Sequence, residues 1–273
     1  MPSTRPSLPK IAVAGWGALG KLVVQALLDD PRYQLVAVGS QQTEALAAYL
    51  AQRHSQARVC SHTQLAGLAD VVMECLSPSA FPALAESLAG SGKTVVVLSA
   101  AALIKQQALL ANAQAGGVKI VVATGAIMGL DAVRAMRRDG ITDCLIVNRK
   151  RPTGLAGAPY ITAHSIDLAA ITQATRVFSG SAHEAATGFP QNVNVAVALS
   201  LAGCGTHATR CEIWADPAVT GNMHSITVKS KSAELSMTTI GVPDPSNPKS
   251  SMLAAHSALA ALDSLYDALR IGS

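Results

Sequence analysis

Three glycines at a fixed spacing, Gly15, Gly17 and Gly20, give the clearest chemical signal in the sequence. They follow an apolar run at 11–14 and open a segment with helical periodicity at 18–29. In such a strand–turn–helix unit the first glycine permits a tight turn and the second lets a pyrophosphate approach the backbone. The third lets the helix pack closely on the strand. The pattern therefore predicts a dinucleotide site.

The expected contacts of that dinucleotide follow from the same geometry. Its pyrophosphate should bind the N–H groups of Ala18 and Leu19 at the positive end of the helix. At the end of the next apolar run a carboxylate usually binds the adenosine ribose, but the sequence has Ser40 and Gln41 there. We expect these two residues to contact the ribose. With neither an acid nor a cation beside them, NAD and NADP both stay possible.

Two further strand ends should border the nicotinamide end, because ligands of open parallel sheets bind at the carboxyl ends of the strands. Leu76 and Ser77 follow the apolar run at 71–74, and Ser99 follows the run that begins at 94. Small neutral residues there suit a nicotinamide ribose. A serine before a helix is equally often an ordinary N-cap, so this alternative stays open.

Short β-branched runs alternate with Ala- and Leu-rich helical segments over residues 10–124, which is typical of βαβ units in a parallel sheet. Helices are expected at 18–29, 42–53, 79–89 and 101–114. After residue 124 three alternating runs at 208–215, 223–229 and 233–240 are separated only by short turns, which indicates antiparallel strands.

We therefore predict an α/β fold with a Rossmann-type, doubly wound parallel sheet in a dinucleotide-binding domain at 1–130. A smaller α+β catalytic and dimerisation domain, with a largely antiparallel sheet, is expected at 131–249. A final amphipathic helix within 250–273 should pack back on the first domain.

Composition excludes several classes of protein. Only 14% of the 273 residues are charged, the net charge is +4 and aromatics make up 3%, so no broad basic face with stacking rings is expected for nucleic acid. The five cysteines form no CxxC pair, and no metal site is predicted. Without an apolar run of about 18 residues or a signal peptide, we expect a soluble cytoplasmic protein with no membrane contact.

Histidine is the first candidate for proton transfer, because its ordinary pKa lies near neutrality. Among the seven histidines, His224 lies where a turn enters an alternating strand, but a lone histidine is more often structural than catalytic. The densest cationic run, Arg149 to Arg151, is interpreted as the solvated end of a strand. A phosphate or carboxylate site is its alternative.

Five segments together resemble the L-aspartate dehydrogenase family. They are TGAIMGLDAV (124–133), RKRPTGLAGAPY (149–160), GSAHEAATGFPQNVNVAVAL (180–199), WADPAVTGNMHSITV (214–228) and NPKSSMLAAHSALAAL (247–262). The resemblance implies a homodimeric oxidoreductase that oxidises L-aspartate with NAD or NADP. The product, iminoaspartate, hydrolyses to oxaloacetate and ammonia or feeds NAD biosynthesis.

The resemblance also implies roles for individual residues. His224 matches the catalytic histidine, which would accept the amine proton or activate the water that attacks the imine. Asn194 matches the asparagine at the nicotinamide end, with helix capping as the alternative. Ala126 and Met128 lie in the same cofactor segment. Met128 replaces a small residue of the family pattern, so it should alter the pocket or the cofactor preference, unless it is a flexible core filler.

An aspartate substrate carries two carboxylates that cations and amides must bind. We expect Lys249 and Asn192 to contact the substrate, with Lys249 favoured over the cluster at Arg149–Arg151. Two other functions stay open at this point. One is a related enzyme acting on another amino acid or imine, which Met128 favours; the other is a dinucleotide-binding sensor without turnover.

Overall fold

The computed structural model describes residues 7–244 and 247–272, and the side chains of 7–242 and 251–272. The chain divides into two compact units. The first consists of Met1–Ser99 with Leu103–Val121, and the second of Ala100–Ala102 with Val122–Ser273. Within the described residues, no helix has both the length and the apolar character that crossing a bilayer requires.

A six-stranded sheet forms the centre of the first unit. Its strands are β1 (Lys10–Ala14), β2 (Gln34–Gly39), β3 (Arg58–Cys60), β4 (Val71–Glu74), β5 (Thr94–Val97) and β6 (Lys119–Val122). Their order is β3-β2-β1-β4-β5-β6, and β1 pairs in parallel with both β2 and β4. The strand order reverses between β1 and β4, where open sheets of this kind bind ligands. The predicted Rossmann-type fold is confirmed.

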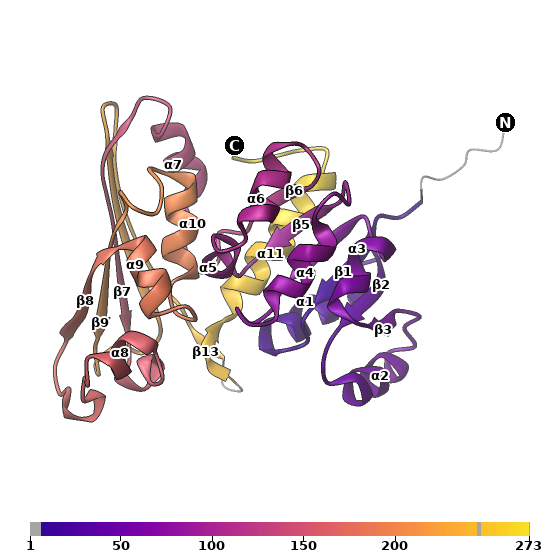
Figure 1. The fold of residues 1–273 in the computed structure, drawn as a ribbon, viewed down its shortest axis with the longest axis horizontal. Coiled ribbons are helices and arrows are strands. Elements are labelled where there is room, and N and C mark those ends of the chain that lie inside the picture. Colours follow the sequence, from indigo (N-terminus) through magenta and orange to yellow (C-terminus); the bar gives the residue numbers. More distant parts are fainter. Residues whose placement is uncertain (1–6, 245–246, 273) are drawn as a thin grey trace. The chain divides into compact units, whose positions relative to one another are not determined.

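Helices connect these strands, drawn in indigo to magenta in Figure 1. They are α1 (Ala18–Asp29), α2 (Thr43–Gln52), η1 (His62–Gln64), α3 (Leu65–Leu68), α4 (Phe81–Leu88), α5 (Ala100–Leu103) and α6 (Gln107–Gln114). The single helix expected at 101–114 is wrong, because the chain turns after α5, where Gln106 N donates to Leu103 O. Strand β3 is not predicted from the sequence, because its three residues are too few to show a pattern.

The second unit contains a mixed five-stranded sheet. Its strands are β7 (Ile141–Lys150), β8 (Thr175–Ser181), β9 (Arg210–Ala215), β10 (Met223–Ser230) and β11 (Glu234–Ile240), in the order β11-β10-β7-β9-β8. Only β7 and β9 pair in parallel, so the largely antiparallel sheet is confirmed. The runs that became β9 and β10 are antiparallel in direction but are not neighbours, because β7 lies between them.

The remaining elements of this unit are mostly helical. They are α7 (Leu130–Met136), η2 (Pro152–Leu155), α8 (Pro159–Ala163), η3 (Leu168–Ala170), α9 (Ala182–Gly188), α10 (Asn194–Ala202), α11 (Met252–Tyr266) and the short strands β12 (Pro243–Asp244) and β13 (Asn247–Ser251). Helix α10 is the most deeply buried and packs against α7 and α9. Its small Ala and Val side chains allow this close approach on nearly all sides.

The division of the chain differs from the one expected from the sequence. The boundary falls at residues 121–122, and α11 is grouped with the second unit, where the Ser257 hydroxyl accepts a hydrogen bond from Gly125 N at 3.0 Å. Packing of this helix on the dinucleotide-binding domain stays a prediction.

Candidate active site

The glycine turn after β1 has the shape that a bound pyrophosphate requires. Gly15 has φ +99, and a Cβ there would lie 2.6 Å from Cys75 O. A Cβ on Gly20 would lie 2.1 Å from Gly15 O, so neither position can hold a larger residue. Gly17 differs, since no atom lies within 4 Å of its Cβ position. It therefore faces open space, as the glycine nearest a phosphate should.

The N-terminus of α1 supplies donors to the same place. Gly17 is the N-cap and has no side chain to satisfy the first turn, and the first helical hydrogen bond runs from Lys21 N to Gly17 O. The N–H groups of Ala18, Leu19 and Gly20 precede that bond and have no acceptor within the helix, so they can donate hydrogen bonds to a phosphate. These residues fit a dinucleotide.

The turn after β2 carries no charge that would select a ribose. Ser40 Oγ accepts a hydrogen bond from Gln42 N at 2.9 Å, and Gln41 is exposed. No carboxylate stands there to bind a 2′-hydroxyl or to repel a 2′-phosphate, and no cation stands there to attract one. This turn fits either cofactor.

A buried acid that is not among the site residues expected from the sequence ties together the ends of β4 and β5. Glu74 is completely buried, and its carboxylate accepts hydrogen bonds from Leu76 N at 2.6 Å, Leu98 N at 3.1 Å and Ser99 N at 2.9 Å. Burial raises the pKa of Glu74 to about 7, and the three backbone donors oppose that rise. The sequence signal that could have identified Glu74 is an acidic residue at the end of the apolar strand VVME.

The two serines beside this acid have different surroundings. Ser99 is buried, and its hydroxyl donates to Leu76 O at 2.8 Å, which adds a second link between the two strand ends. Ser77 is exposed, and its Oγ lies 3.0 Å from the Oγ of Ser79. The segment at 75–77 is therefore held in place by buried hydrogen bonds to Leu76, whereas Ser77 is accessible.

His224 lies in the second unit on the buried face of β10. It is directly opposite Asn148 in the register with β7, and His224 Nδ1 lies 2.7 Å from Asn148 Oδ1. An amide oxygen can only accept, so Nδ1 carries the proton and donates it. Asn148 Nδ2 donates in turn to Cys211 Sγ at 3.6 Å, which fixes the amide orientation. The other ring nitrogen, His224 Nε2, therefore carries the lone pair that can accept a proton.

Lys150 lies on the same face, two residues along β7 from Asn148. It is only 7% exposed, and its amino group donates to Asn192 Oδ1 at 2.9 Å. The interpretation of this cationic run as a solvated strand end is wrong for Lys150. Side chains alternate along a strand, so Arg149 points to the opposite face, where it binds Asp216 and lies over the Trp214 ring.

Burial controls the charge state of both groups. It lowers the pKa of Lys150 to about 8, which leaves the amine mainly protonated at pH 7. Burial, followed by the nearby charge of Lys150, lowers the pKa of His224 to about 3. His224 is therefore neutral at pH 7, as a proton acceptor must be.

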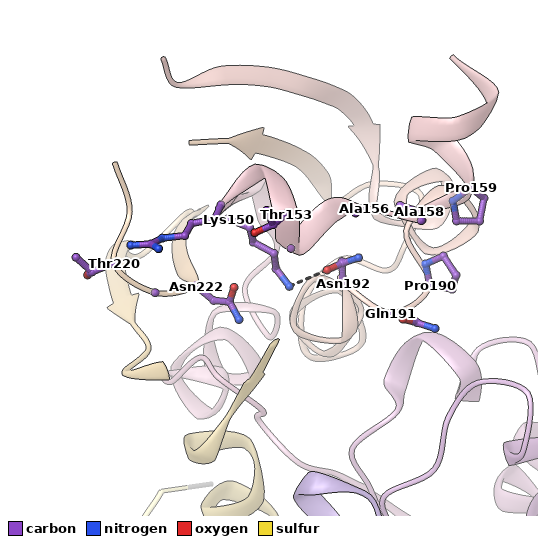
Figure 2. Close-up of a pocket in the computed structure, with 14 residues that line it drawn as sticks. Lys150, Thr153, Ala156, Ala158, Pro159, Pro190, Gln191, Asn192, Thr220 and Asn222 are labelled. Carbon is purple, nitrogen blue, oxygen red and sulfur yellow. Dashed lines mark hydrogen bonds between the residues drawn. The ribbon is translucent and has the colours of Figure 1, made fainter. Parts of the chain in front are cut away.

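A cavity of about 620 Å³ opens beside Lys150. Two of the loops that line it carry Asn192 and Asn222, and the apolar part of its wall comes from Ala, Gly and Pro residues at 154–159 and from Pro190. Figure 2 shows the Lys150 amino group pointing toward Asn192 in the space that the labelled residues surround. This volume suits a small ligand.

Other residues singled out from the sequence lie in varied surroundings. Asn194 is the first residue of α10 and does not cap it; its Oδ1 accepts a hydrogen bond from Ala101 N at 3.1 Å. Ala126 is buried, whereas Met128 is 52% exposed, so the core-filler interpretation is wrong. Lys249 lies in β13, and its side chain is outside the described part of the structure.

Two family models match the chain. The model described as "Aspartate dehydrogenase, C-terminal" matches residues 131–265, and the one described as "Homoserine dehydrogenase, NAD binding domain" matches residues 15–123. The first covers most of the second unit, and the other covers the glycine turn and strands β2 to β6 of the parallel sheet.

Curated relatives match along nearly the whole chain. An L-aspartate dehydrogenase of Bradyrhizobium diazoefficiens is 39% identical over 99% of this chain and 96% of that protein. An L-aspartate dehydrogenase of Methanococcoides burtonii is 34% identical over 97% of this chain and 99% of that protein.

Solved structures share the fold. Aspartate dehydrogenase from Thermotoga maritima has a TM-score of 0.76 at 21% identity and covers 97% of this chain and 100% of its own. Scyllo-inositol dehydrogenase from Lactobacillus casei, solved with bound NAD(H) and scyllo-inositol, has a TM-score of 0.51 at 14% identity and covers 95% of this chain and 89% of its own.

Proposed function

Since the chain belongs to the aspartate dehydrogenase family, we propose that it oxidises L-aspartate with NAD or NADP to iminoaspartate, which hydrolyses to oxaloacetate and ammonia. The observation that carries this proposal is the neutral His224, oriented by Asn148, on the same buried sheet face as the cation Lys150. Such a set can handle a proton next to a carboxylate-bearing substrate.

The bound nicotinamide would supply the acceptor for the hydride that leaves the α-carbon of the substrate. The amine must lose its proton so that its lone pair can form the C=N bond. Asn148 holds the proton on Nδ1 of His224, so Nε2 accepts this amine proton or a proton from the water that attacks the imine. General base help of this kind is typically worth about 10²- to 10⁴-fold in rate.

The first unit would hold the rest of the cofactor. Its pyrophosphate would bind at Gly15, Gly17, Ala18, Leu19 and Gly20, its adenosine ribose at Ser40 and Gln41, and its other ribose at Leu76 and Ser77. This assignment is supported by the open space at Gly17 and by the uncapped first turn of α1.

In the second unit, the family resemblance supports contacts of Ala126, Met128 and Asn194 with the nicotinamide. With Oδ1 taken by Ala101 N, the Asn194 amide keeps Nδ2 as a donor for the carboxamide. The exposed Met128 is available for such a contact. Asn192 and Lys249 stay the substrate contacts expected from the sequence, and homodimer formation in the cytoplasm and supply of NAD biosynthesis belong to the same proposal.

A panel of amino acids tested with NAD⁺ and with NADP⁺ checks this function. We expect L-aspartate to give the largest kcat/KM, read as formation of the reduced nicotinamide. Preference for another amino acid would favour the related dehydrogenase. Dinucleotide binding without turnover of any amino acid would favour the sensor. Comparing the two cofactors with L-aspartate shows which ribose the turn at Ser40 accepts.

A further inference from the structure

Lys150 presents a charge that the protein itself does not balance. Among the described residues its amino group has one hydrogen-bond partner, the neutral amide of Asn192, and no carboxylate within 4.0 Å. The neighbouring cations are differently placed: Arg149 binds Asp216 on the other face, and Arg151 is exposed with its Nε bound to Val219 O. A buried ammonium without an anion is costly, so it is seldom retained without a reason.

The cavity beside Lys150 has the charge that an anionic ligand needs. Within the described part of the chain, its lining contains two cations, Lys150 and Arg151, and no acidic residue. Asn192 and Asn222 add amide groups from two separate loops. Because the Asn192 oxygen accepts from Lys150, its Nδ2 stays available as a donor to the same ligand.

We propose that Lys150 binds a carboxylate of the substrate and, together with Arg151 and the amide of Asn192, makes this cavity specific for dicarboxylic molecules. That the substrate is an acidic amino acid is taken from the proposed function, on which this proposal rests. It assigns the buried anchoring cation to β7, whereas the sequence favoured Lys249. Charge-assisted hydrogen bonds to a carboxylate in a desolvated site are the strong ones.

This role has a consequence for His224. The positive charge of Lys150 is one cause of the low pKa of His224. A carboxylate bound to Lys150 would balance that charge and make His224 Nε2 a better proton acceptor in the substrate complex than in the empty site. Binding of the correct substrate would thereby help to activate the base.

Succinate is the probe for this site, because it has two carboxylates and no amine to oxidise. Its binding to the cofactor-free protein is measured by calorimetry for the wild type, for Lys150→Met and for the control Lys231→Met, which changes an exposed lysine in the turn between β10 and β11. KM for L-aspartate is measured alongside. Loss of one charged hydrogen bond predicts that the Kd for succinate and the KM for L-aspartate each rise about 10- to 100-fold in Lys150→Met. Neither constant should change in Lys231→Met.

The outcomes separate this proposal from the proposed function. If the wild type oxidises L-aspartate and Lys150→Met keeps both its succinate affinity and its KM, Lys150 is not the anchor. If succinate binding depends on Lys150 but no amino acid is oxidised, the carboxylate site stands and the proposed function fails. Should Lys150→Met fail to fold, a crystal structure of the wild type with succinate decides: a carboxylate must lie within hydrogen-bond distance of Lys150 Nζ, and succinate bound elsewhere overturns the proposal.

Discussion

Replacing Lys150 with methionine should stabilise the empty protein while damaging its function. Methionine has a similar length and no charge, so it removes the buried ammonium and fills the same space. Functional sites commonly retain groups that lower stability. Lys150 is such a group, since no anion of the described residues balances it.

The size of the effect follows from the pKa. Burial lowers the pKa of Lys150 from 10.5 to about 8, and each pKa unit corresponds to about 1.4 kcal/mol, so keeping the amine charged costs roughly 3 kcal/mol. The variant also loses the hydrogen bond to Asn192, which lowers its stability by about 1–2 kcal/mol and offsets part of this gain. We therefore expect Lys150→Met to raise the free energy of unfolding at pH 7 by about 1–2 kcal/mol.

The pH dependence of this difference has a defined sign. Below about pH 8 the amine is charged in both the folded and the unfolded state, so the full cost is present. Between about pH 8 and pH 10.5 the folded state binds fewer protons than the unfolded state, so the wild type gains stability as the pH rises. The advantage of the Lys150→Met variant should shrink over this window.

Urea unfolding of the cofactor-free protein from pH 7 to pH 10.5 measures this difference. Lys231→Met serves as the control, because it removes the charge of an exposed lysine in place of a buried one. A Lys150→Met variant that is less stable than the wild type at pH 7, or whose difference stays constant to pH 10.5, would refute the reasoning about the buried charge.

Three other substitutions test the remaining parts of the site. Gly17→Ala should raise the Kd for the dinucleotide at least about tenfold without lowering the unfolding midpoint, because its Cβ meets only open space; unchanged cofactor affinity would contradict the pyrophosphate assignment. His224→Ala should lower kcat by about 10²- to 10⁴-fold with cofactor affinity unchanged, and near-normal turnover would rule out its role as a base. Glu74→Gln should destabilise the protein by about 1–3 kcal/mol, because the single amide oxygen cannot accept from Leu76 N on one side and from Leu98 N and Ser99 N on the other; urea unfolding should show no such loss for the exposed control Glu86→Gln.

The first unit could be predicted closely because its signals are local. A glycine turn between a buried strand and an amphipathic helix is encoded within about 30 residues. Continuous apolar runs indicate strands that are covered on both faces, as in a parallel sheet. Strands β3 and β8 were missed for a related reason. The first is too short to show a period, and β8 alternates weakly because only one of its residues, Phe178, is buried.

Strand pairing in the second unit is not local. Short turns predicted that the runs at 208–215 and 223–229 would be antiparallel neighbours, but the longer β7 lies between them. Pairing depends on which edges bury the most apolar surface together, and the sequence of a single strand does not contain that information.

By itself the sequence determined the dinucleotide turn, the two kinds of sheet and, through its resemblance to a family, the choice of His224. Only the tertiary structure decided what surrounds that histidine. The alternation along 142–150 already put Asn148 and Lys150 on one face, but only the packed structure shows that this face is buried. Burial lowers the pKa of Lys150, and the pairing of β10 with β7 places Asn148 against His224. Both are properties of the packed molecule.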